Sequence, residues 1–414
     1  MNRLASFIAC ALLLSCLLAF NVQLGSSDPA LIVVPDNYLT IQEAINKANV
    51  GDTIYVRNGT YTGTIVVNKT VSLVGENRAT TIIDAGGNFD GVLVEADNVT
   101  IMEFMVWNTR WFGIHVKSSG CYITTNNLTR NQEGIMLDGE TSVARNNVVF
   151  NNSITDNLDT AILIWNSQNN NITQNFVRNN AFGIYLHINA SMNLVEHNQV
   201  LDNECAGIPI AYDSSDNIIS DNNVSGNGHS GCGVWESGIS LAISSKRNII
   251  TRNEISNNRL GILLQSYSDT NLIYHNNLIN NTEQVEAHSP LCSNIWNIEY
   301  PCGGNFWDNY NGTDLYSGPY QNITGSDGIG DSSHVINSEN VDRYPLMEPF
   351  DLCIGDLSED GKVDMVDLGI ASRAFGSYPG HPRWNPIADL NKDERVDTRD
   401  IAVIARNFGK THLD

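Results

Sequence analysis

The stretch "NIITRNEISNNRLGI", residues 248–262, decides the fold of this protein. It places Asn248, Asn253, Asn257 and Asn258 among isoleucines, just before a glycine. Asparagine is unfavourable inside helices and strands because its amide competes for backbone hydrogen bonds. A single stretch of this kind would indicate a loop. This one recurs along the chain, and therefore indicates a periodic structure that holds the amides.

The repeated pattern is N-x-x-x-x-N-x-(I/L/V). Clear copies begin at Asn193, Asn217, Asn248 and Asn271, and weaker copies at Asn98, Cys121, Asn147 and Asn170. The starts are spaced 23, 26, 23, 23, 24, 31 and 23 residues apart. A Gly-Ile or Ala-Ile pair follows most starts by 13 to 15 residues. The 31-residue unit carries its extra residues in "GHSGCGVWES", which predicts a loop on one face.

A period near 23 residues fits few architectures. Leucine-rich repeats share the period, but they need a fixed leucine frame and usually a helix in each unit. Here short runs of Ile, Val and Leu alternate with Asn and Gly. We therefore predict a mainly β chain that forms a right-handed parallel β-helix, with coils stacked about 4.8 Å apart. Equivalent asparagines would then form vertical ladders, which gives them a structural role.

The beginning of the solenoid carries a helix signal. Thr40 is a candidate N-cap, and Glu43 three residues later completes a capping box. Ile41, Ala44 and Ile45 follow at helical spacing. A short amphipathic helix here would cover the first coil, which otherwise exposes its core and a strand edge.

Two segments extend this reading through a family resemblance. "LTIQEAINKANVGDTIYVRNGTYTGTIVVNKTVSLVGENRATTIIDAGG" resembles the start of right-handed β-helix proteins of the pectate-lyase type. The Asn-rich repeats and the ending "GGNFWDNYNGTDLYSGPYQ…GSDGIGD…NVDRYPLMEPF" resemble the NosD-type copper-processing and carbohydrate-binding/sugar-hydrolase (CASH) family. The resemblance covers about residues 30–350 and implies a β-helix domain over 28–349. It does not imply an activity, because fold does not determine function.

The C-terminal segment carries two calcium-type loops, "DLSEDGKVDMVD" and, 33 residues later, "DLNKDERVDTRD". Oxygen ligands at positions 1, 3, 5, 7, 9 and 12 of such a loop wrap a hard cation, position 7 through its backbone carbonyl. The predicted ligands are Asp356, Ser358, Asp360, Lys362, Asp364, Asp367, Asp389, Asn391, Asp393, Arg395, Asp397 and Asp400.

Apolar residues at helical spacing follow each loop. Two loops that are each followed by one helix resemble a dockerin type I domain, here over residues 350–414. Gly361 matches the glycine of the family at loop position 6, whereas Glu394 departs from it. The resemblance implies two Ca²⁺ ions and a cohesin-like or other surface protein as partner.

Composition bears on the partners and the location. The formal net charge is −23 and the pI is near 4.6, which argues against nucleic acid and anionic membranes as partners. Residues 1–27 are predicted to be a signal peptide, with an uncleaved anchor or lipidation at Cys16 as alternatives. No later segment is apolar enough to span a bilayer. We therefore expect a secreted or cell-surface protein.

Export permits disulfides and glycosylation. Cys205 and Cys232 fall at similar phases of adjacent coils, and Cys292 and Cys302 flank a short loop, so both pairs are candidate disulfides. Asn-x-Ser/Thr sequons occur along the chain and are compatible with a glycoprotein.

A candidate sugar-binding face follows the Gly-Ile marks. The outward residues there form columns in which exposed Trp165 and Tyr185 would stack on sugar rings, with Lys117, Asp138 and His187 beside them. The Asp-Asp pair and Gly-His-Gly motif of polygalacturonase-like enzymes do not occur, so no catalytic residue is predicted. Three functions stay open: a polysaccharide-binding protein that docks to a partner, a polysaccharide lyase or glycosyl hydrolase with unrecognised acids, and a structural surface-layer-associated protein.

Overall fold

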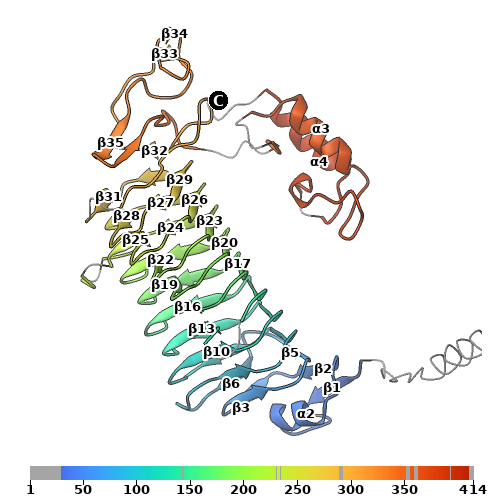
Figure 1. The fold of residues 1–414 in the computed structure, drawn as a ribbon. Helices are drawn as coiled ribbons and strands as arrows, with labels where there is room; N and C mark the ends of the chain where they lie inside the picture. The colour runs from blue at the N-terminus through green and yellow to red at the C-terminus, as the bar shows by residue number, and fades with distance from the viewer. Residues whose placement is uncertain are drawn as a thin grey trace, which may run out of the picture.

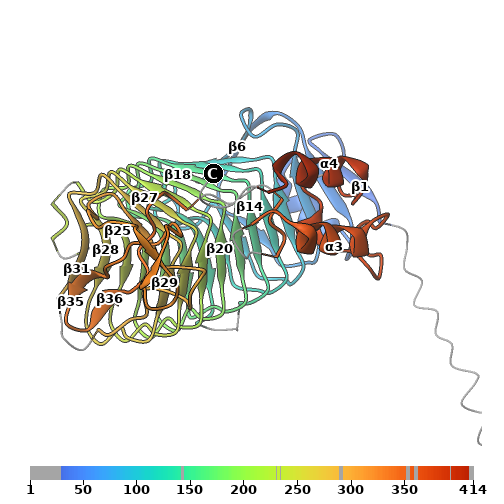
Figure 2. The ribbon, with the colours of Figure 1, turned by 90° about the horizontal axis from the view of Figure 1, so that it is seen from above.

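The protein is a parallel β-helix followed by a small helical unit (Figures 1 and 2). The structure is a computed structural model that describes residues 29–140, 144–229, 231–233, 235–288, 292–350, 355–358, 362–391 and 393–409. The predicted signal peptide lies outside the described residues. Among the described residues, no helix combines the length and the apolar character needed to cross a bilayer.

Three parallel sheets, here called A, B and C, run the length of the solenoid, and each coil contributes strands to them. Sheet A has 11 strands: β1 (Leu31–Val34), β2 (Thr53–Val56), β5 (Ser72–Gly75), β8 (Thr100–Met102), β11 (Tyr122–Thr124), β14 (Val148–Phe150), β17 (Asn171–Thr173), β20 (Leu194–Glu196), β23 (Ile218–Ser220), β26 (Ile249–Thr251) and β29 (Leu272–Tyr274).

Sheet B also has 11 strands: β3 (Gly59–Thr62), β6 (Thr81–Asp84), β9 (Met105–Trp107), β12 (Asn127–Thr129), β15 (Ser153–Thr155), β18 (Phe176–Arg178), β21 (Gln199–Leu201), β24 (Asn223–Ser225), β27 (Glu254–Ser256), β30 (Asn277–Ile279) and β32 (Phe306–Trp307).

Sheet C has 10 strands, which include the longest of the solenoid: β4 (Ile65–Val67), β7 (Val92–Val94), β10 (Phe112–Val116), β13 (Glu133–Asp138), β16 (Thr160–Trp165), β19 (Phe182–His187), β22 (Ala206–Ala211), β25 (Ser237–Leu241), β28 (Leu260–Leu264) and β31 (Glu283–Ala287).

The asparagines form three ladders, as the repeat predicts. In each ladder the backbone N–H of one asparagine donates to the side-chain oxygen of the asparagine one coil later, and most side-chain amides donate there too. The ladders run through Asn147, Asn170, Asn193, Asn217, Asn248, Asn271 and Asn294; through Asn126, Asn152, Asn175, Asn198, Asn222, Asn253, Asn276 and Asn305; and through Asn131, Asn157, Asn180, Asn203, Asn227, Asn258 and Asn281.

This arrangement explains the stretch at residues 248–262. Asn248, Asn253 and Asn258 each belong to a different ladder and are fully buried. Asn257 is exposed and has φ 54°, in the left-handed region that asparagine tolerates better than most residues. The amides are therefore buried but paired, which removes the cost of placing polar groups among isoleucines.

Both ends of the solenoid core are covered. Helix α2 (Ile41–Lys47) has the predicted capping box between Thr40 and Glu43, and its apolar face joins the core at the N-terminal end (Figure 1). At the other end Trp296 and Trp307 are buried with ring centroids 5.6 Å apart. Two short hairpins follow: β33 (Tyr316–Ser317) with β34 (Ile323–Thr324), and β35 (His334–Asn337) with β36 (Asn340–Asp342).

The C-terminal unit has its own small core. Helices α3 (Met365–Ala374) and α4 (Thr398–Asn407) contact each other, and the 3₁₀ helix η1 (Pro386–Ala388) lies between them in sequence. Val363, Val396 and Ile404 are fully buried in this core. Each helix follows one of the two predicted loops, as expected.

Candidate functional site: the outer face of sheet C and the C-terminal loops

The outward columns of sheet C lie in the predicted register. Asp138 pairs with Trp165, Trp165 with His187, and His187 with Ala211 on successive strands. Tyr185 pairs with Leu163 in the neighbouring column. The residues expected to bind sugar therefore share one continuous face.

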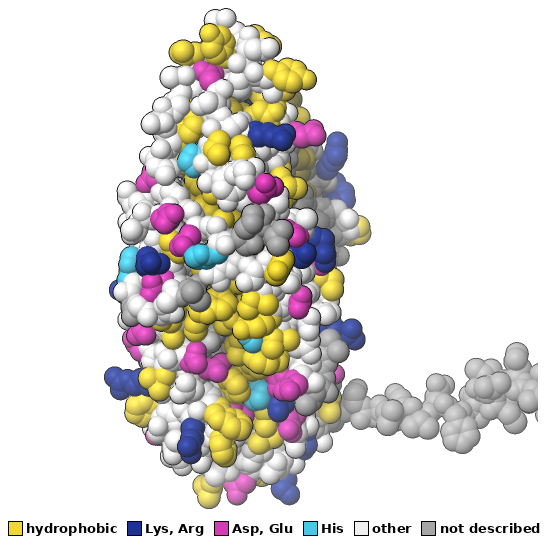
Figure 3. Space-filling model, turned by 60° about the vertical axis from the view of Figure 1, so that its left-hand side comes forward, with side chains coloured by type: hydrophobic (Ala, Val, Ile, Leu, Met, Phe, Trp, Pro, Cys, Tyr) yellow, Lys and Arg dark blue, Asp and Glu magenta, His cyan; other side chains and the backbone are white. Residues whose placement is uncertain are grey.

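Aromatic rings gather on this face into a group that we call the aromatic patch: Trp165, Tyr185, His187, Tyr212 and Trp235. The His187 ring lies 4.5 Å from Trp165, 4.7 Å from Tyr185 and 4.6 Å from Tyr212, centroid to centroid. Because the rings pack on one another, Trp165 and Tyr185 are half-buried rather than fully exposed as expected. Figure 3 shows hydrophobic side chains gathered over the side of the solenoid on which sheet C lies.

The insertion of the 31-residue unit supplies Trp235, whose ring lies 6.4 Å from that of Tyr185. A disulfide between Cys205 and Cys232 ties this insertion to the preceding coil. The other candidate bridge does not form in the structure. Cys292 is buried in the solenoid core, whereas Cys302 lies half-buried in the turn after it, so the two thiols occupy different environments.

Next to the patch, a histidine bridges two carboxylates. His115 Nδ1 lies 3.1 Å from Asp90 Oδ2, and its Nε2 lies 3.1 Å from Asp138 Oδ2. All three side chains are almost completely buried. Burial opposes a charge on the ring, but the hydrogen bonds to Asp138 and Asp90 outweigh it and raise the pKa of His115. The two carboxylates thus favour the protonated form of the ring.

Two further carboxyl groups lie beside this bridge. Burial, and then the charge of Asp159, raises the pKa of Glu133 to about 8, although His115 opposes the shift. Burial also raises the pKa of Asp159. Glu133 Oε2 is buried, and none of the described residues hydrogen-bonds to it. Asp159 Oδ1 accepts only a weak hydrogen bond, 3.3 Å long, from Thr160 Oγ1.

Sequence analysis missed this cluster except for Asp138. Asp90, His115, Glu133 and Asp159 stand on different coils and come together only through stacking. The signal available in the sequence was the column phase, since His115 is level with Met136 and Leu163 on the following strands. Lys117, which was predicted, acts electrostatically on both His115 and Asp138.

The two C-terminal loops share one hydrogen-bond pattern. Asp367 Oδ1 accepts from the backbone N–H groups of residues 357 and 358, and its Oδ2 accepts from that of Asp364. Thirty-three residues later Asp400 makes the same three contacts with residues 390, 391 and Asp397. Both position-12 carboxylates are fully buried. The duplication seen in the sequence is therefore a duplication of structure.

The donor chemistry of the loops fits a hard cation. In the second loop the side chains of Asp389, Asn391 and Asp393 converge, because the Asp393 N–H donates to Asp389 Oδ1 and Asn391 Nδ2 donates to Asp393 Oδ2. Glu394 adopts φ 62°, the backbone for which glycine is preferred at position 6. Within the described residues no three His, Cys, Asp or Glu side chains gather as a metal cluster. Asp360 lies outside the described residues.

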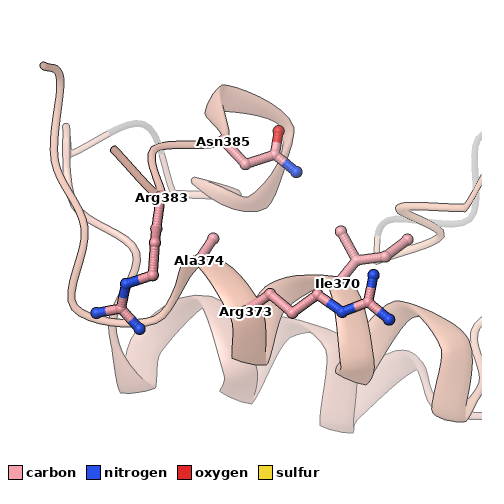
Figure 4. Close-up of a pocket in the computed structure, with 5 residues that line it drawn as sticks. All are labelled: Ile370, Arg373, Ala374, Arg383 and Asn385. Carbon is pink, nitrogen blue, oxygen red and sulfur yellow. The ribbon is translucent and has the colours of Figure 1, made fainter. Parts of the chain in front are cut away.

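A cavity of about 410 Å³ lies beside α3, lined by Ile370, Arg373, Ala374, Arg383 and Asn385 (Figure 4). Figure 4 shows the three α3 residues along the helix and the other two on the segment before η1. Two guanidinium groups beside apolar side chains suit an acidic protein surface better than a neutral sugar. The residues that line this cavity are far from sheet C in the sequence, and they differ in chemical character from the aromatic patch.

Comparison with known families agrees with both halves of this structure. Residues 112–278 match the family described as "Right handed beta helix region", and residues 354–409 match "Dockerin type I domain". The chain carries a right-handed β-helix and a dockerin type I domain. Dockerin type I domains bind calcium and dock onto cohesins, and proteins that carry them are usually extracellular or at the cell surface. The resemblance of the solenoid to the NosD type stays a prediction.

No curated protein matches the chain. Several solved structures are similar to the solenoid. The mannuronan C-5 epimerase AlgE6 A-module of Azotobacter vinelandii is 14% identical, with 62% of this chain and 92% of that chain covered and a TM-score of 0.45. The catalytic domain of a GH87 α-1,3-glucanase is 13% identical, with 66% of this chain and 69% of that chain covered and a TM-score of 0.45. The PL6 alginate lyase AlyGC is 16% identical, with 60% of this chain and 43% of that chain covered and a TM-score of 0.42. At these identities the likeness concerns the fold alone.

Proposed function

We propose that the protein binds polysaccharide on the outer face of sheet C and docks to a cohesin-like or other surface protein through its dockerin domain. The aromatic patch carries the first half of this proposal. Sugar rings stack on aromatic faces, and Tyr and Trp add polar groups that reach hydroxyls. A patch that spans several stacked coils offers a long platform, which suits a polymer better than a small molecule.

The patch also offers a neutral polar group that can hydrogen-bond to sugar hydroxyls. Burial lowers the pKa of His187 to about 4, so its ring is neutral at neutral pH. Its Nδ1 is buried, and no described residue hydrogen-bonds to it. Lys117 and Asp138, at the edge of the patch, complete the predicted binding residues with a cation and a carboxylate. Together with Trp165 and Tyr185 they form the proposed sugar-binding set.

In the dockerin domain we propose two Ca²⁺ sites. The side chains that would hold the ions are Asp356, Ser358, Asp360, Asp364 and Asp367 in the first loop and Asp389, Asn391, Asp393, Asp397 and Asp400 in the second, with the backbone carbonyls of Lys362 and Arg395 at position 7. Bound calcium would neutralise carboxylates that otherwise repel one another. The two loops would thereby position α3 and α4 for a partner.

Three organisational features belong to the same proposal. The signal peptide would cover residues 1–27, the β-helix domain 28–349 and the dockerin domain 350–414. The mature protein would be secreted or attached to the cell surface, where its disulfide is stable.

Retention by polysaccharide tests the binding half. In affinity electrophoresis through gels that contain soluble β-glucan, xylan, galactomannan, pectate or alginate, the full chain should be retarded by at least one polymer. Trp165→Ala and Tyr212→Ala should abolish the retardation. Tyr320→Ala, which removes an exposed ring from the end-cap hairpin region, should not. Equal retardation of all three variants would exclude the patch.

A pull-down tests the docking half. The full chain should capture a cohesin in calcium and release it in a chelator. Asp367→Ala and Asp400→Ala together should prevent capture even in calcium, because both loops lose their position-12 ligand. Capture that is independent of calcium and of both substitutions would contradict the proposal.

A further inference from the structure

We propose that the outer face of sheet C also hydrolyses the polysaccharide it binds, with Glu133 as general acid and Asp159 as general base, and that the substrate is a neutral glycan. This inference rests on the proposed polysaccharide binding and adds a reaction, two catalytic residues and a substrate class.

The register brings the two carboxyl groups together. Ile135 pairs with Ile162, so Glu133 is level with Thr160, and Asp159 is one residue away on the adjacent coil. This offset places their Cα atoms roughly 6 Å apart. The charge of Asp159 adds to burial in raising the pKa of Glu133. Paired acids on one face are the arrangement that glycoside hydrolysis requires.

Of the four carboxyl groups in the cluster, Glu133 and Asp159 are the two that are available to a substrate. Asp90 and Asp138 are both engaged by His115 and almost completely buried, so neither is assigned the proton transfers of the reaction. Glu133 and Asp159 are only half-buried, and each retains oxygen atoms without a strong partner among the described residues. Glu133 and Asp159 are therefore more accessible to a substrate than the three side chains of the His115 bridge.

Aromatic rings lie on both sides of the acid pair along the solenoid axis. Trp111, one coil before Glu133, and Phe89, one coil before Trp111, are half-exposed with ring centroids 4.4 Å apart. On the C-terminal side the aromatic patch contributes Tyr185 on β19, one coil after Asp159, whereas Trp165 ends β16, the strand that begins directly after Asp159. In Figure 3 acidic and histidine side chains lie among the hydrophobic ones in the lower part of this face. A polymer laid along the axis would stack on rings at both ends and present a linkage to the acids between them.

The chemistry follows from the protonation states. Glu133 in its acid form donates its proton to the glycosidic oxygen as the bond from that oxygen to the anomeric carbon breaks. Water adds its oxygen to the anomeric carbon, and the ionised Asp159 takes the released proton. The products are a new reducing end and a new hydroxyl group. The water molecule balances the reaction, and no other co-reactant is needed.

Charge decides the class of substrate. Four carboxyl groups, Asp90, Glu133, Asp138 and Asp159, share the site with two basic side chains, His115 and Lys117. The acidic groups of the site therefore outnumber the basic ones. A uronate polymer would bring a further carboxylate into this field, and elimination from a uronate requires that carboxylate to be neutralised. Neutral sugars avoid this repulsion, and hydrolysis is the cleavage open to them.

The test uses the full chain and the polymer that retards it most in the binding experiment. We expect new reducing ends from a neutral glycan and no absorbance at 235 nm from unsaturated uronates. Glu133→Gln and Asp159→Asn should each lower the rate about 100-fold or more while retardation is unchanged. Glu95→Gln, which changes an exposed acid outside the cluster, should retain the full rate.

The pH profile separates a catalytic acid from a structural one. The rate should fall as pH rises through about 8, where Glu133 loses its proton, and fall again in acid as Asp159 becomes protonated. Glu133→Asp should keep part of the rate and move the alkaline limb. Added formate should restore activity to Asp159→Ala by replacing the missing carboxylate.

Three results would overturn the inference. Retardation by a polymer without any new reducing ends would leave the binding proposal intact and remove hydrolysis. Unsaturated products from pectate or alginate would replace hydrolysis with elimination. Full activity in a folded Glu133→Gln variant would exclude the assigned acid. Absence of retardation by every polymer would instead count against the proposed function itself.

Discussion

The solenoid and the dockerin domain bury polar groups in opposite ways. The solenoid buries neutral amides, and each ladder asparagine finds its acceptor one coil further on, as Asn198 does at Asn222 Oδ1. The dockerin domain buries carboxylates, Asp367 and Asp400, against backbone N–H groups. An amide ladder is complete within the protein, whereas clustered carboxylates carry charge that a cation can neutralise. The solenoid should therefore be stable without a bound ion, whereas the stability of the dockerin domain should depend on calcium.

The same contrast appears where a carboxylate ends an amide ladder. The second ladder ends at Asp342, which accepts from the backbone N–H of Asn305 and from Trp307 Nε1. Burial raises the pKa of Asp342 to about 6 despite these hydrogen bonds. One acid at the end of the solenoid thus gives a pH dependence that the amides lack.

The largest effect should come from breaking a ladder in the middle. Asn222→Ala removes the acceptor of two Asn198 donors and the donor to three acceptors, Asn253 Oδ1 among them. Because buried groups without partners cost 1–3 kcal/mol each, we expect a loss of about 3 kcal/mol or more in the free energy of unfolding, measured by denaturant titration. The exposed neighbour variant Asn223→Ala is the control. Equal stability of the two variants would refute the role of the ladder.

Calcium removal should act on the dockerin domain alone. At a calcium concentration 100 times the dissociation constant, binding contributes about 2.7 kcal/mol for each site, which a chelator removes. Calorimetry should show the transition of the dockerin domain moving to lower temperature and that of the solenoid staying in place. A solenoid transition that moved equally would break the comparison between the two regions.

The pH dependence of the end cap should be smaller. The unfolded chain releases the Asp342 proton near pH 4 and the folded chain near pH 6, so the folded state binds more protons between these values. Stability from this group is present below about pH 4, falls as the pH rises through this window, and levels off above about 6. Melting temperatures from pH 4 to 8 should show the fall, and Asp342→Asn should flatten it. A variant as pH-dependent as the wild type would point to another group.

The smallest effect is expected at loop position 6. Glu394 pays for its left-handed backbone, which glycine adopts freely, so Glu394→Gly should stabilise the loop by about 1 kcal/mol. Calorimetry in calcium, together with calcium titration, would measure the gain. Arg395→Gly, at the next position, should have the opposite sign because it only adds freedom to the unfolded chain. Stabilisation by both variants would contradict the conformational explanation.

Much of the molecule was predictable because it repeats. The regular spacing of Asn193, Asn217 and Asn248 predicted the stacking of coils, and the structure contains the ladder that these residues form. The capping box at Thr40 was predictable because its contacts are local. The prediction of a Cys292–Cys302 disulfide was wrong, because proximity in sequence does not show which of two thiols faces the core. Half-burial of Trp165 was missed because its covering rings come from other coils.

By itself, the sequence determined the coil, the three asparagine ladders, the capping helix and the doubled acidic loops. Each of these depends on contacts within one repeat or at a constant interval, which a periodic pattern records directly. Only the tertiary structure decided the acid cluster and the aromatic patch. Asp90, His115, Glu133 and Asp159 belong to separate coils, and Trp235 reaches Tyr185 through a tethered insertion. Stacking brings such residues within a few ångströms, and no spacing within a single repeat reveals which of them will meet.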